Sequence, residues 1–383
     1  MSDPLLSAET LADWVLRFVR YPSEQGERME AEPAVLGFVR ECVKPLADSL
    51  GLSGRFDEMG NYLMEIGPAG GEPALAFFGY AMTHPAAGMA RPFAGERLQA
   101  HGEPAIRGRG VSEQKSALAA ALAAFADAAR SRLAQRVCLV VTTAGETGRH
   151  DAASCALQAL GAVPRRAVVA LGTDSRVSLG NRGRIDAQIV VRGKAAHSSS
   201  PDAGIDAIAG LREVLDALAR VRGTLPRHAE LGPATLTPTG VESFPKATHT
   251  VQDEVRLTID RRLLPGERAE DALEAIRAAL PAGRPWSTEL QRGAHMLPHQ
   301  LAREAPLVGL IAEAHRRAAL EAPRLFYSAA ALDAGFLTAR GAEATMWGPG
   351  AMEQFHSSEE FVRLRDVLDV ARAYRELIAL AAA

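Results

Sequence analysis

The chain has 383 residues, of which 47% are apolar and 23% are charged, and its formal net charge is −3. This composition is typical of a globular protein, and the length suffices for two domains or for one large domain with an insertion. Because charges of both signs are interspersed, no nucleic-acid-binding surface is indicated. Cys42, Cys138 and Cys155 show no paired or metal-binding spacing, which indicates a reducing compartment. No signal peptide and no membrane span are predicted, so we expect a cytoplasmic protein.

The first half of the chain alternates helical and strand patterns. Amphipathic or helix-forming segments lie at 8–20 and 30–50, and apolar segments of strand length lie at 62–66, 74–78, 137–143 and 167–171. Unbroken apolar strands that alternate with helices are typical of an α/β fold with a helix-covered mixed, largely parallel sheet. Tyr80, Glu146 and Asp174 each follow one of these strands. Loops at the carboxyl ends of such strands form ligand sites, so these residues are candidates for one.

A glycine-rich turn that contains Glu113 lies between two of the strands. Gly108 and Gly110 permit a backbone with positive φ and a close approach to a site. Ser112 is a plausible N-cap for the alanine- and leucine-rich helix that follows, which we expect to end near Leu133. A carboxylate in such a turn could bind a metal or a cationic substrate group, although an ordinary solvated loop explains the same residues.

The pattern changes after Gly183. Alternating strands at 185–191 and 251–259 and helices at 205–221 and 269–280 indicate a small α+β domain inserted into the larger one. Helices near 303–320 and 329–340 follow, and a last helix is expected from about 359 to 380. The predicted domains are therefore 1–182 with 294–383, and 183–293.

The order of motifs resembles the dinuclear zinc aminoacylase and carboxypeptidase family, which includes acetylornithine deacetylase, succinyl-diaminopimelate desuccinylase and glutamate carboxypeptidase. The motifs that carry the resemblance are Gly108-Arg-Gly-Val-Ser-Glu-Gln-Lys115, Arg192-Gly-Lys-Ala-Ala-His-Ser198, Asp260-Arg-Arg-Leu-Leu-Pro-Gly-Glu267, and Gly348-Pro-Gly350 with His356 and Glu359. The resemblance implies a zinc exopeptidase-like catalytic domain with an inserted lid that makes a homodimer.

Several metal-site positions of the family are altered in this chain. The ligand histidine of the first motif falls on Tyr80 and its supporting aspartate on Met82. The usual general base falls on Gly145. The acidic ligand after the next strand falls on Thr173, with Asp174 one place later as a possible substitute. His84, four residues beyond Tyr80, is another possible ligand, or a surface histidine.

By the same comparison, this chain keeps the ligand residues of the family's second metal. Glu113 stands at the bridging carboxylate, Glu146 at the second glutamate, and His356 at the C-terminal histidine. Two carboxylates and one imidazole with an open position form a suitable ligand set for zinc or a similar divalent ion. We therefore expect at most one metal ion per chain.

The resemblance also assigns substrate-contacting residues in the inserted domain. His197 stands at the position that reaches across the dimer to polarise the scissile carbonyl, and a donor there would stabilise an oxyanion. His249 stands where an asparagine near the site is usual. Arg262 stands at an arginine that grips a substrate carboxylate, although an ion pair with Asp260 or Glu267 explains Arg262 as well.

These observations favour a metallohydrolase that acts on an amide or related C–N bond of a small molecule, such as an N-acyl amino acid or a peptide-like substrate. The proton acceptor would have to be Tyr80, Glu146 or a substrate group, because Gly145 cannot serve. The alternative is a non-hydrolytic relative that uses the same cleft for binding or for different chemistry. Substrate identity does not follow from the sequence.

Overall fold

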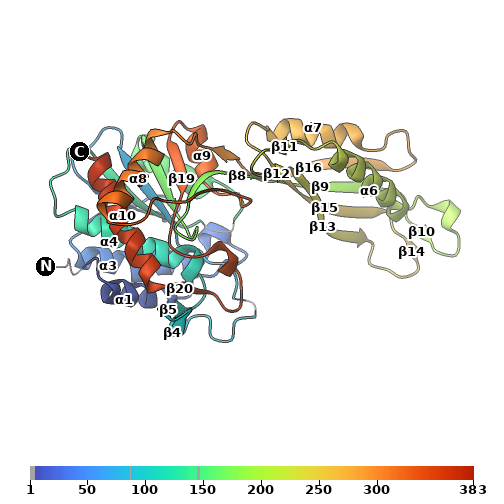
Figure 1. The fold of residues 1–383 in the computed structure, drawn as a ribbon. Coiled ribbons are helices and arrows are strands. Elements are labelled where there is room, and N and C mark those ends of the chain that lie inside the picture. Colours follow the sequence, from blue (N-terminus) through green and yellow to red (C-terminus); the bar gives the residue numbers. More distant parts are fainter. Residues whose placement is uncertain (1–4, 87, 145–146) are drawn as a thin grey trace. The chain divides into compact units, whose positions relative to one another are not determined.

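A computed structural model describes residues 5–86, 88–144 and 147–383, which form two units (Figure 1). The larger unit contains the chain up to Gly180 together with Gln300–Phe326 and Phe336–Ala383. The smaller unit contains Asn181–His299 and Tyr327–Gly335. It therefore includes residues 294–299 and 327–335, which the sequence assigned to the other domain. The Tyr327 ring lies 5.5 Å from that of His228, a contact within the smaller unit that sequence periodicity does not reveal.

The larger unit is built on a six-stranded sheet in the order β1-β2-β6-β3-β7-β19. Its strands are β1 (Gly54–Phe56), β2 (Tyr62–Ile66), β3 (Leu75–Tyr80), β6 (Val137–Thr142), β7 (Arg166–Ala170) and β19 (Glu343–Met346). The last four are parallel, whereas β2 runs antiparallel to both β6 and β1. The expected largely parallel mixed sheet is confirmed. The carboxyl ends of these four strands meet at one edge of the sheet, where Tyr80 ends β3 and Asp174 comes shortly after β7.

Helices surround this sheet. They are α1 (Ala8–Val19), α2 (Pro33–Gly37), α3 (Lys44–Ser49), α4 (Ser116–Ala128), α5 (Asp151–Leu160), α8 (Pro306–Arg317), α9 (Ala334–Ala339) and α10 (Leu364–Ala381), with π-helical turns at Phe38–Val43 and Val111–Lys115. Every residue of α4 is buried, because α4 packs on β3, β6 and β7 and is covered by α1 and α10 (Figure 1). This helix ends at Ala128, earlier than the expected Leu133.

Several short strands complete this part of the chain. A three-stranded antiparallel sheet is formed by β4 (Glu96–Ala100), β5 (Glu103–Arg107) and β20 (Phe361–Arg363). The strands β8 (Val177–Asn181), β17 (His299–Gln300) and β18 (Leu325–Ser328) contain or adjoin the boundaries between the units. The last helix was predicted to begin near residue 359, but it begins at Leu364 because β20 precedes it.

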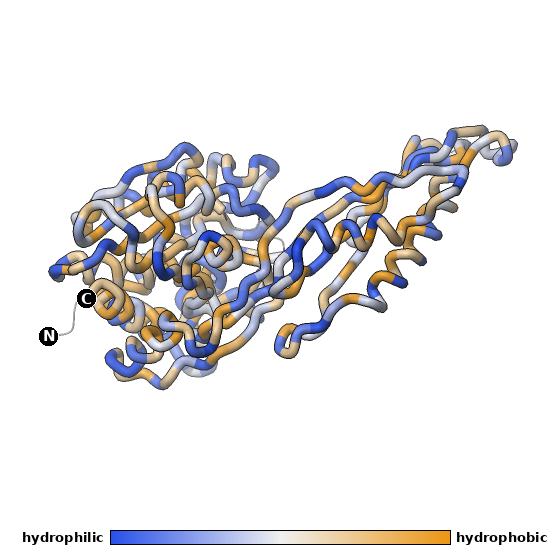
Figure 2. The backbone as a smooth tube through the Cα atoms, turned by 90° about the horizontal axis from the view of Figure 1, so that it is seen from above, coloured by the Kyte–Doolittle hydropathy of each residue, from blue (hydrophilic) through white to orange (hydrophobic). Residues whose placement is uncertain are grey.

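The smaller unit is a four-stranded antiparallel sheet in the order β13-β15-β9-β16. Its elements are β9 (Gly183–Arg192), β13 (Thr235–Phe244), β15 (Glu254–Leu263), β16 (Ser287–Met296), α6 (Ala207–Gly223) and α7 (Ala269–Ala279), with the short pairs β10 (Ala196–His197) and β14 (Thr250–Val251), and β11 (Arg227–His228) and β12 (Gly232–Pro233). Both helices pack on this sheet (Figure 1). Ile189, Leu257 and Ile259 are buried beneath them. The resulting alternation of polar and apolar residues is visible along the tube at the right of Figure 2.

No helix within the described residues is both long enough and apolar enough to cross a membrane.

Candidate active site

The turn that carries Glu113 differs from the predicted loop and cap. Gly110 has φ 76° and precedes a π-helical turn, Val111–Lys115, so Glu113 lies inside helical structure and is only 5% exposed. Ser112 is not the N-cap, because its hydroxyl donates to the Ala351 carbonyl at 2.9 Å. Gly108 does not have positive φ; a Cβ there would lie 2.3 Å from Val19 Cγ1, so close packing explains this glycine.

Glu360 holds this turn in place, and the sequence did not single it out. Its carboxylate accepts hydrogen bonds from the backbone N–H groups of Gly110 and Ser112, both at 2.9 Å, and from Glu113 N at 3.3 Å. Arg109 Nη1 donates to the same carboxylate at 2.9 Å, and both side chains are 1% exposed. Burial raises the pKa of the Glu360 carboxyl, and these hydrogen bonds oppose the shift. Because all four partners are donors, they favour the ionised form.

The loops after β7 and β19 pack against the same turn. Gly172 N donates to the Glu113 carbonyl at 2.8 Å. A Cβ on Gly350 would lie 1.8 Å from the Ser112 carbonyl oxygen, so only glycine fits there. Residues from three distant parts of the sequence thus meet at the carboxyl edge of the sheet.

Glu113 and His356 face each other at this edge. Glu113 Oε2 lies 3.4 Å from His356 Nε2, and the His356 side chain is 40% exposed. His356 adopts φ 60°, a left-handed backbone that few residues other than glycine take. The ring of His84 stacks on that of His356, with centroids 3.8 Å apart and planes at 15°. The structure therefore brings together two of the three predicted second-site ligands, and it adds His84 as a neighbour.

The first-site positions present different side chains. Tyr80 is 2% exposed at the end of β3, and Met82 is completely buried. Thr173 is also buried, and its hydroxyl donates to the Arg176 carbonyl at 2.6 Å and accepts from Gly348 N at 3.1 Å. Asp174 pairs with Arg324 at 3.3 Å, and both line a cavity that neither Glu113 nor His356 lines.

Gly145 and Glu146 lie outside the described residues. Within the residues that are described, no three histidine, cysteine, aspartate or glutamate side chains are grouped so that they could hold a metal ion. Glu113 and His356 can still form part of a site for one ion, because a carboxylate and an imidazole that face each other are ligand types that zinc accepts. Glu146 would have to supply the third ligand.

The predicted substrate-contacting residues lie in the smaller unit. His197 is in β10 and is exposed, and Ser198 N donates to the His249 carbonyl at 2.8 Å, so the two histidines lie on adjacent hydrogen-bonded segments. The backbone N–H of Ser199 lies 3.2 Å from His197 Nδ1 and donates to it. Arg262 Nε donates to Asp260 at 2.9 Å, which bears out the ion-pair interpretation of this arginine. Glu267 pairs with the neighbouring Arg261 instead.

Comparison with known proteins agrees with this architecture. Residues 179–287 match the model of a peptidase dimerisation domain of the M20 family. The uncharacterised Escherichia coli K12 protein YgeY is 33% identical over 46% of this chain, and the match covers 44% of YgeY, less than half of its length. The acetylornithine deacetylase of Myxococcus xanthus is 28% identical over 68% of each chain.

Solved structures share the fold over almost the whole chain. A tripeptidase from Staphylococcus aureus superposes with a TM-score of 0.77 at 17% identity, covering 98% of this chain and 99% of its own. An M20 family metallo-carboxypeptidase from Sulfolobus solfataricus gives 0.78 at 14% identity, with 97% and 99% coverage. The chain therefore contains a segment that matches the peptidase dimerisation domain of the M20 family, and it shares the fold of an M20 family metallo-carboxypeptidase over almost its whole length.

Proposed function

We propose that the chain is a metal-dependent hydrolase that cleaves an amide or related C–N bond in a small N-acylated or peptide-like substrate. The observation that carries this proposal is the facing pair Glu113 and His356, 3.4 Å apart at the carboxyl edge of the sheet. Both occupy ligand positions of the zinc aminoacylase and carboxypeptidase family that the chain resembles. The names of its relatives and structural neighbours, which include a deacetylase, a tripeptidase and a carboxypeptidase, support the same class of reaction.

The altered positions favour one ion per chain. Tyr80, Met82 and Thr173 are buried, and Thr173 uses its hydroxyl within its own turn. Asp174 is held by Arg324, which makes it a poor substitute ligand. Glu113, Glu146 and His356 would hold the ion. A bound zinc would polarise the substrate carbonyl and lower the pKa of a water molecule.

His197 is suited to donate a hydrogen bond to a substrate carbonyl. Because its Nδ1 accepts from the Ser199 N–H, the neutral ring carries its proton on Nε2. A donor aimed at a developing oxyanion is commonly worth two to three orders of magnitude in rate, roughly 3 kcal/mol. Arg262 is a weaker candidate because Asp260 already accepts from its guanidinium. His249 lies on the segment that pairs with that of His197, and we propose that it contacts the substrate.

The proton acceptor remains the open chemical question of this site. Tyr80 and Glu146 are the two protein groups that we propose for it. Tyr80→Phe removes only the phenol oxygen. If Tyr80 takes part in proton transfer, this substitution should reduce kcat by about two orders of magnitude while the metal content is unchanged.

Elemental analysis of protein purified without chelator, combined with assays on a panel of N-acyl amino acids and dipeptides, tests the proposal. We expect about one divalent ion per chain, lost in His356→Ala and retained in His101→Ala, which removes an exposed histidine elsewhere. Two ions per chain would show that a second site exists. A fully loaded protein that hydrolyses nothing in the panel would favour a binding role for the cleft.

A further inference from the structure

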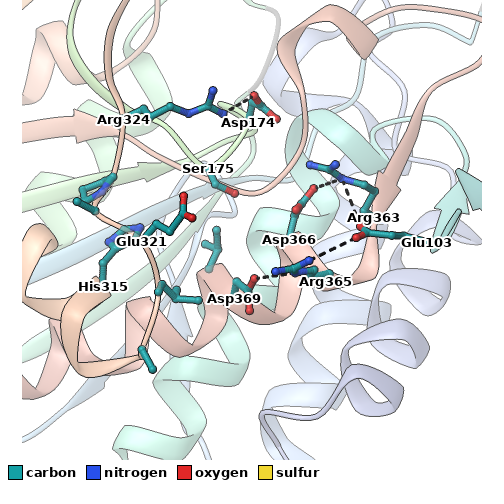
Figure 3. A pocket seen from close by; sticks show the side chains of 15 residues that line it. Glu103, Asp174, Ser175, His315, Glu321, Arg324, Arg363, Arg365, Asp366 and Asp369 are labelled. Carbon is teal, nitrogen blue, oxygen red and sulfur yellow. Dashed lines mark hydrogen bonds and ion pairs between the residues drawn. The ribbon is translucent and has the colours of Figure 1, made fainter. Parts of the chain in front are cut away.

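A cavity of about 380 Å³ opens in the larger unit, and neither Glu113 nor His356 lines it. Its wall comes from four places: the end of α8 with its connection to β18, the turn after β7, the start of β5, and the end of β20 with the first turns of α10 (Figure 3). Its charged and titratable lining residues are Glu103, Asp174, His315, Glu321, Arg324, Arg363, Arg365, Asp366 and Asp369.

The cavity carries an excess of negative charge. Its five carboxylates face three arginines, so two negative charges remain unbalanced. Arg324 pairs with Asp174 at 3.3 Å, and Arg363 pairs with Asp366 at 2.7 Å. Arg365 is shared between Glu103 at 3.5 Å and Asp369 at 3.6 Å.

Two carboxylates of the cavity are therefore poorly balanced. Glu321 makes no ion pair or hydrogen bond with another described side chain. Among the described residues, Arg365 is the cation that pairs with Asp369, and Glu103 shares it. An ammonium or guanidinium group of a ligand would give each of these two carboxylates a cationic hydrogen-bond donor.

His315 provides an independent sign of a ligand. Its side chain is 5% exposed, and Figure 3 shows it in the wall of the cavity. Its ring is fixed, because Nδ1 donates to the Ile311 carbonyl at 2.9 Å and the ring stacks on Trp347 at 5.1 Å. Burial lowers the pKa of His315, which favours the neutral ring. Nε2 then bears a lone pair, and it has no partner among the described residues.

We propose that this cavity binds a small organic cation with an amino or guanidino group at each end. Glu321 and Asp369 would accept from one cationic group each, and His315 Nε2 would accept a further N–H. A volume of about 380 Å³ lies at the lower end of the range of small-molecule sites, roughly 300–1,000 Å³, which suits a short diamine. The described residues contain no group of ligands that could hold a metal ion, so the spread of acceptors favours an extended organic ligand.

The cavity shares one turn with the candidate active site. Asp174 and Ser175 line the cavity with φ 57° and 56°, and their backbone N–H groups donate to Gly350 and Gly348. In the same turn Gly172 N donates to the Glu113 carbonyl. The binding proposal does not depend on hydrolysis at that site.

Isothermal titration calorimetry with putrescine tests the inference, with butanediol of the same chain length as the uncharged control. Putrescine should bind at one site per chain, more weakly as salt is added, and butanediol should not bind. Glu321→Gln and Asp369→Asn should each weaken binding roughly tenfold, because each removes a charged acceptor. Both residues are at least partly exposed, so both variants should fold.

Glu304→Gln is the matched control, since it removes an exposed carboxylate of the same unit outside the cavity. It should leave the affinity unchanged. The inference is overturned if putrescine and butanediol behave alike at millimolar concentration. It is equally overturned if Glu304→Gln weakens binding as much as Glu321→Gln and Asp369→Asn do, because binding would then reflect surface charge alone.

Discussion

Lys115 is a completely buried lysine directly after the turn that carries Glu113. Its Nζ donates to the carbonyls of Phe18 at 2.8 Å and Tyr21 at 2.7 Å and lies 4.9 Å from the centre of the Phe38 ring. Burial lowers the pKa of Lys115 to about 7. This lysine therefore ties α1 to the active-site turn mainly through hydrogen bonds to neutral carbonyl groups.

The first prediction concerns the pH dependence of stability. In the unfolded chain the lysine keeps a pKa of about 10.4. From about pH 10 down to about pH 7 only the unfolded chain holds this proton, so the free energy of unfolding should fall as pH falls. The slope should reach at most about 1.4 kcal/mol per pH unit and vanish below about pH 7.

Urea denaturation across this pH range measures the free energy of unfolding of the parent and of Lys115→Met. If the methionine is tolerated, the advantage of Lys115→Met over the parent in this free energy should shrink toward high pH. Lys246→Met, at a lysine that is 72% exposed, should follow the parent at every pH. If the parent and Lys115→Met curves run parallel, the buried lysine titrates normally.

The second prediction concerns His84, which stacks on His356. If His84 only positions the His356 ring, His84→Phe should keep the stack and retain metal, while His84→Ala should weaken metal binding roughly tenfold. Competition with a chromogenic chelator measures this affinity. Equal loss in both variants would show that His84 is itself a ligand, which the sequence left open.

At the scale of elements, β20 and the turn before α4 are joined through Glu360. The third prediction is that Glu360→Gln leaves Arg109 buried without its counter-ion and destabilises the fold by about 3 kcal/mol or more. Metal affinity should fall too, because the backbone at Glu113 is held by the same carboxylate. Urea denaturation and metal titration provide the two measurements.

Glu359→Gln is the matched control, one residue away. Glu359 is 71% exposed and pairs with Arg107, which is 31% exposed. Its substitution should cost less than about 1 kcal/mol. Comparable effects of the two substitutions would mean that the buried pair does not fix the turn.

The adjacent glutamates also show where sequence reasoning reaches its limit. The motif marked Glu359, but nothing in two consecutive glutamates tells which one points inward until β20 sets the alternation. The apolar strands β3, β6 and β7 were predicted closely, because burial on both faces leaves an unbroken apolar run. The predictions missed β13 and β16, whose residues are mostly exposed or half-buried and follow no apolar alternation. The ion pair of Arg262 with Asp260 was one of the sequence interpretations, and it follows from spacing, because residues two apart in β15 share one face of the strand.

At the scale of the whole molecule, the surface of the smaller unit is unusual. Ile208, Leu215 and Val241 are 48%, 38% and 59% exposed, and they are the large apolar side chains exposed within the described part of the chain. Ile208 and Leu215 are seven residues apart on α6, hence on one face, and β13 is an edge strand. The match to a peptidase dimerisation domain covers all three. We propose that this surface forms a homodimer, which would also bring His197 to the partner's site.

The fourth prediction is therefore that the protein is a dimer at micromolar concentration by size exclusion with light scattering. Ile208→Asp combined with Leu215→Asp should yield a folded monomer, since both side chains already face solvent in the single chain. Asp216→Lys, a charge change at an exposed neighbour on α6, should remain dimeric. A parent protein that elutes as a monomer would leave His197 without its proposed role.

The late position of α10 in the chain has a consequence for synthesis on the ribosome. Helix α4 is buried partly by α10, and Arg375 Nε of α10 lies 3.0 Å from Asp127 Oδ2 at the end of α4. These two elements are separated by more than 200 residues, including the whole smaller unit. During translation, the alanine- and leucine-rich surface of α4 must therefore stay uncovered until α10 has been synthesised. The nascent chain should engage chaperones through this segment, while residues 181–299 can already begin to fold.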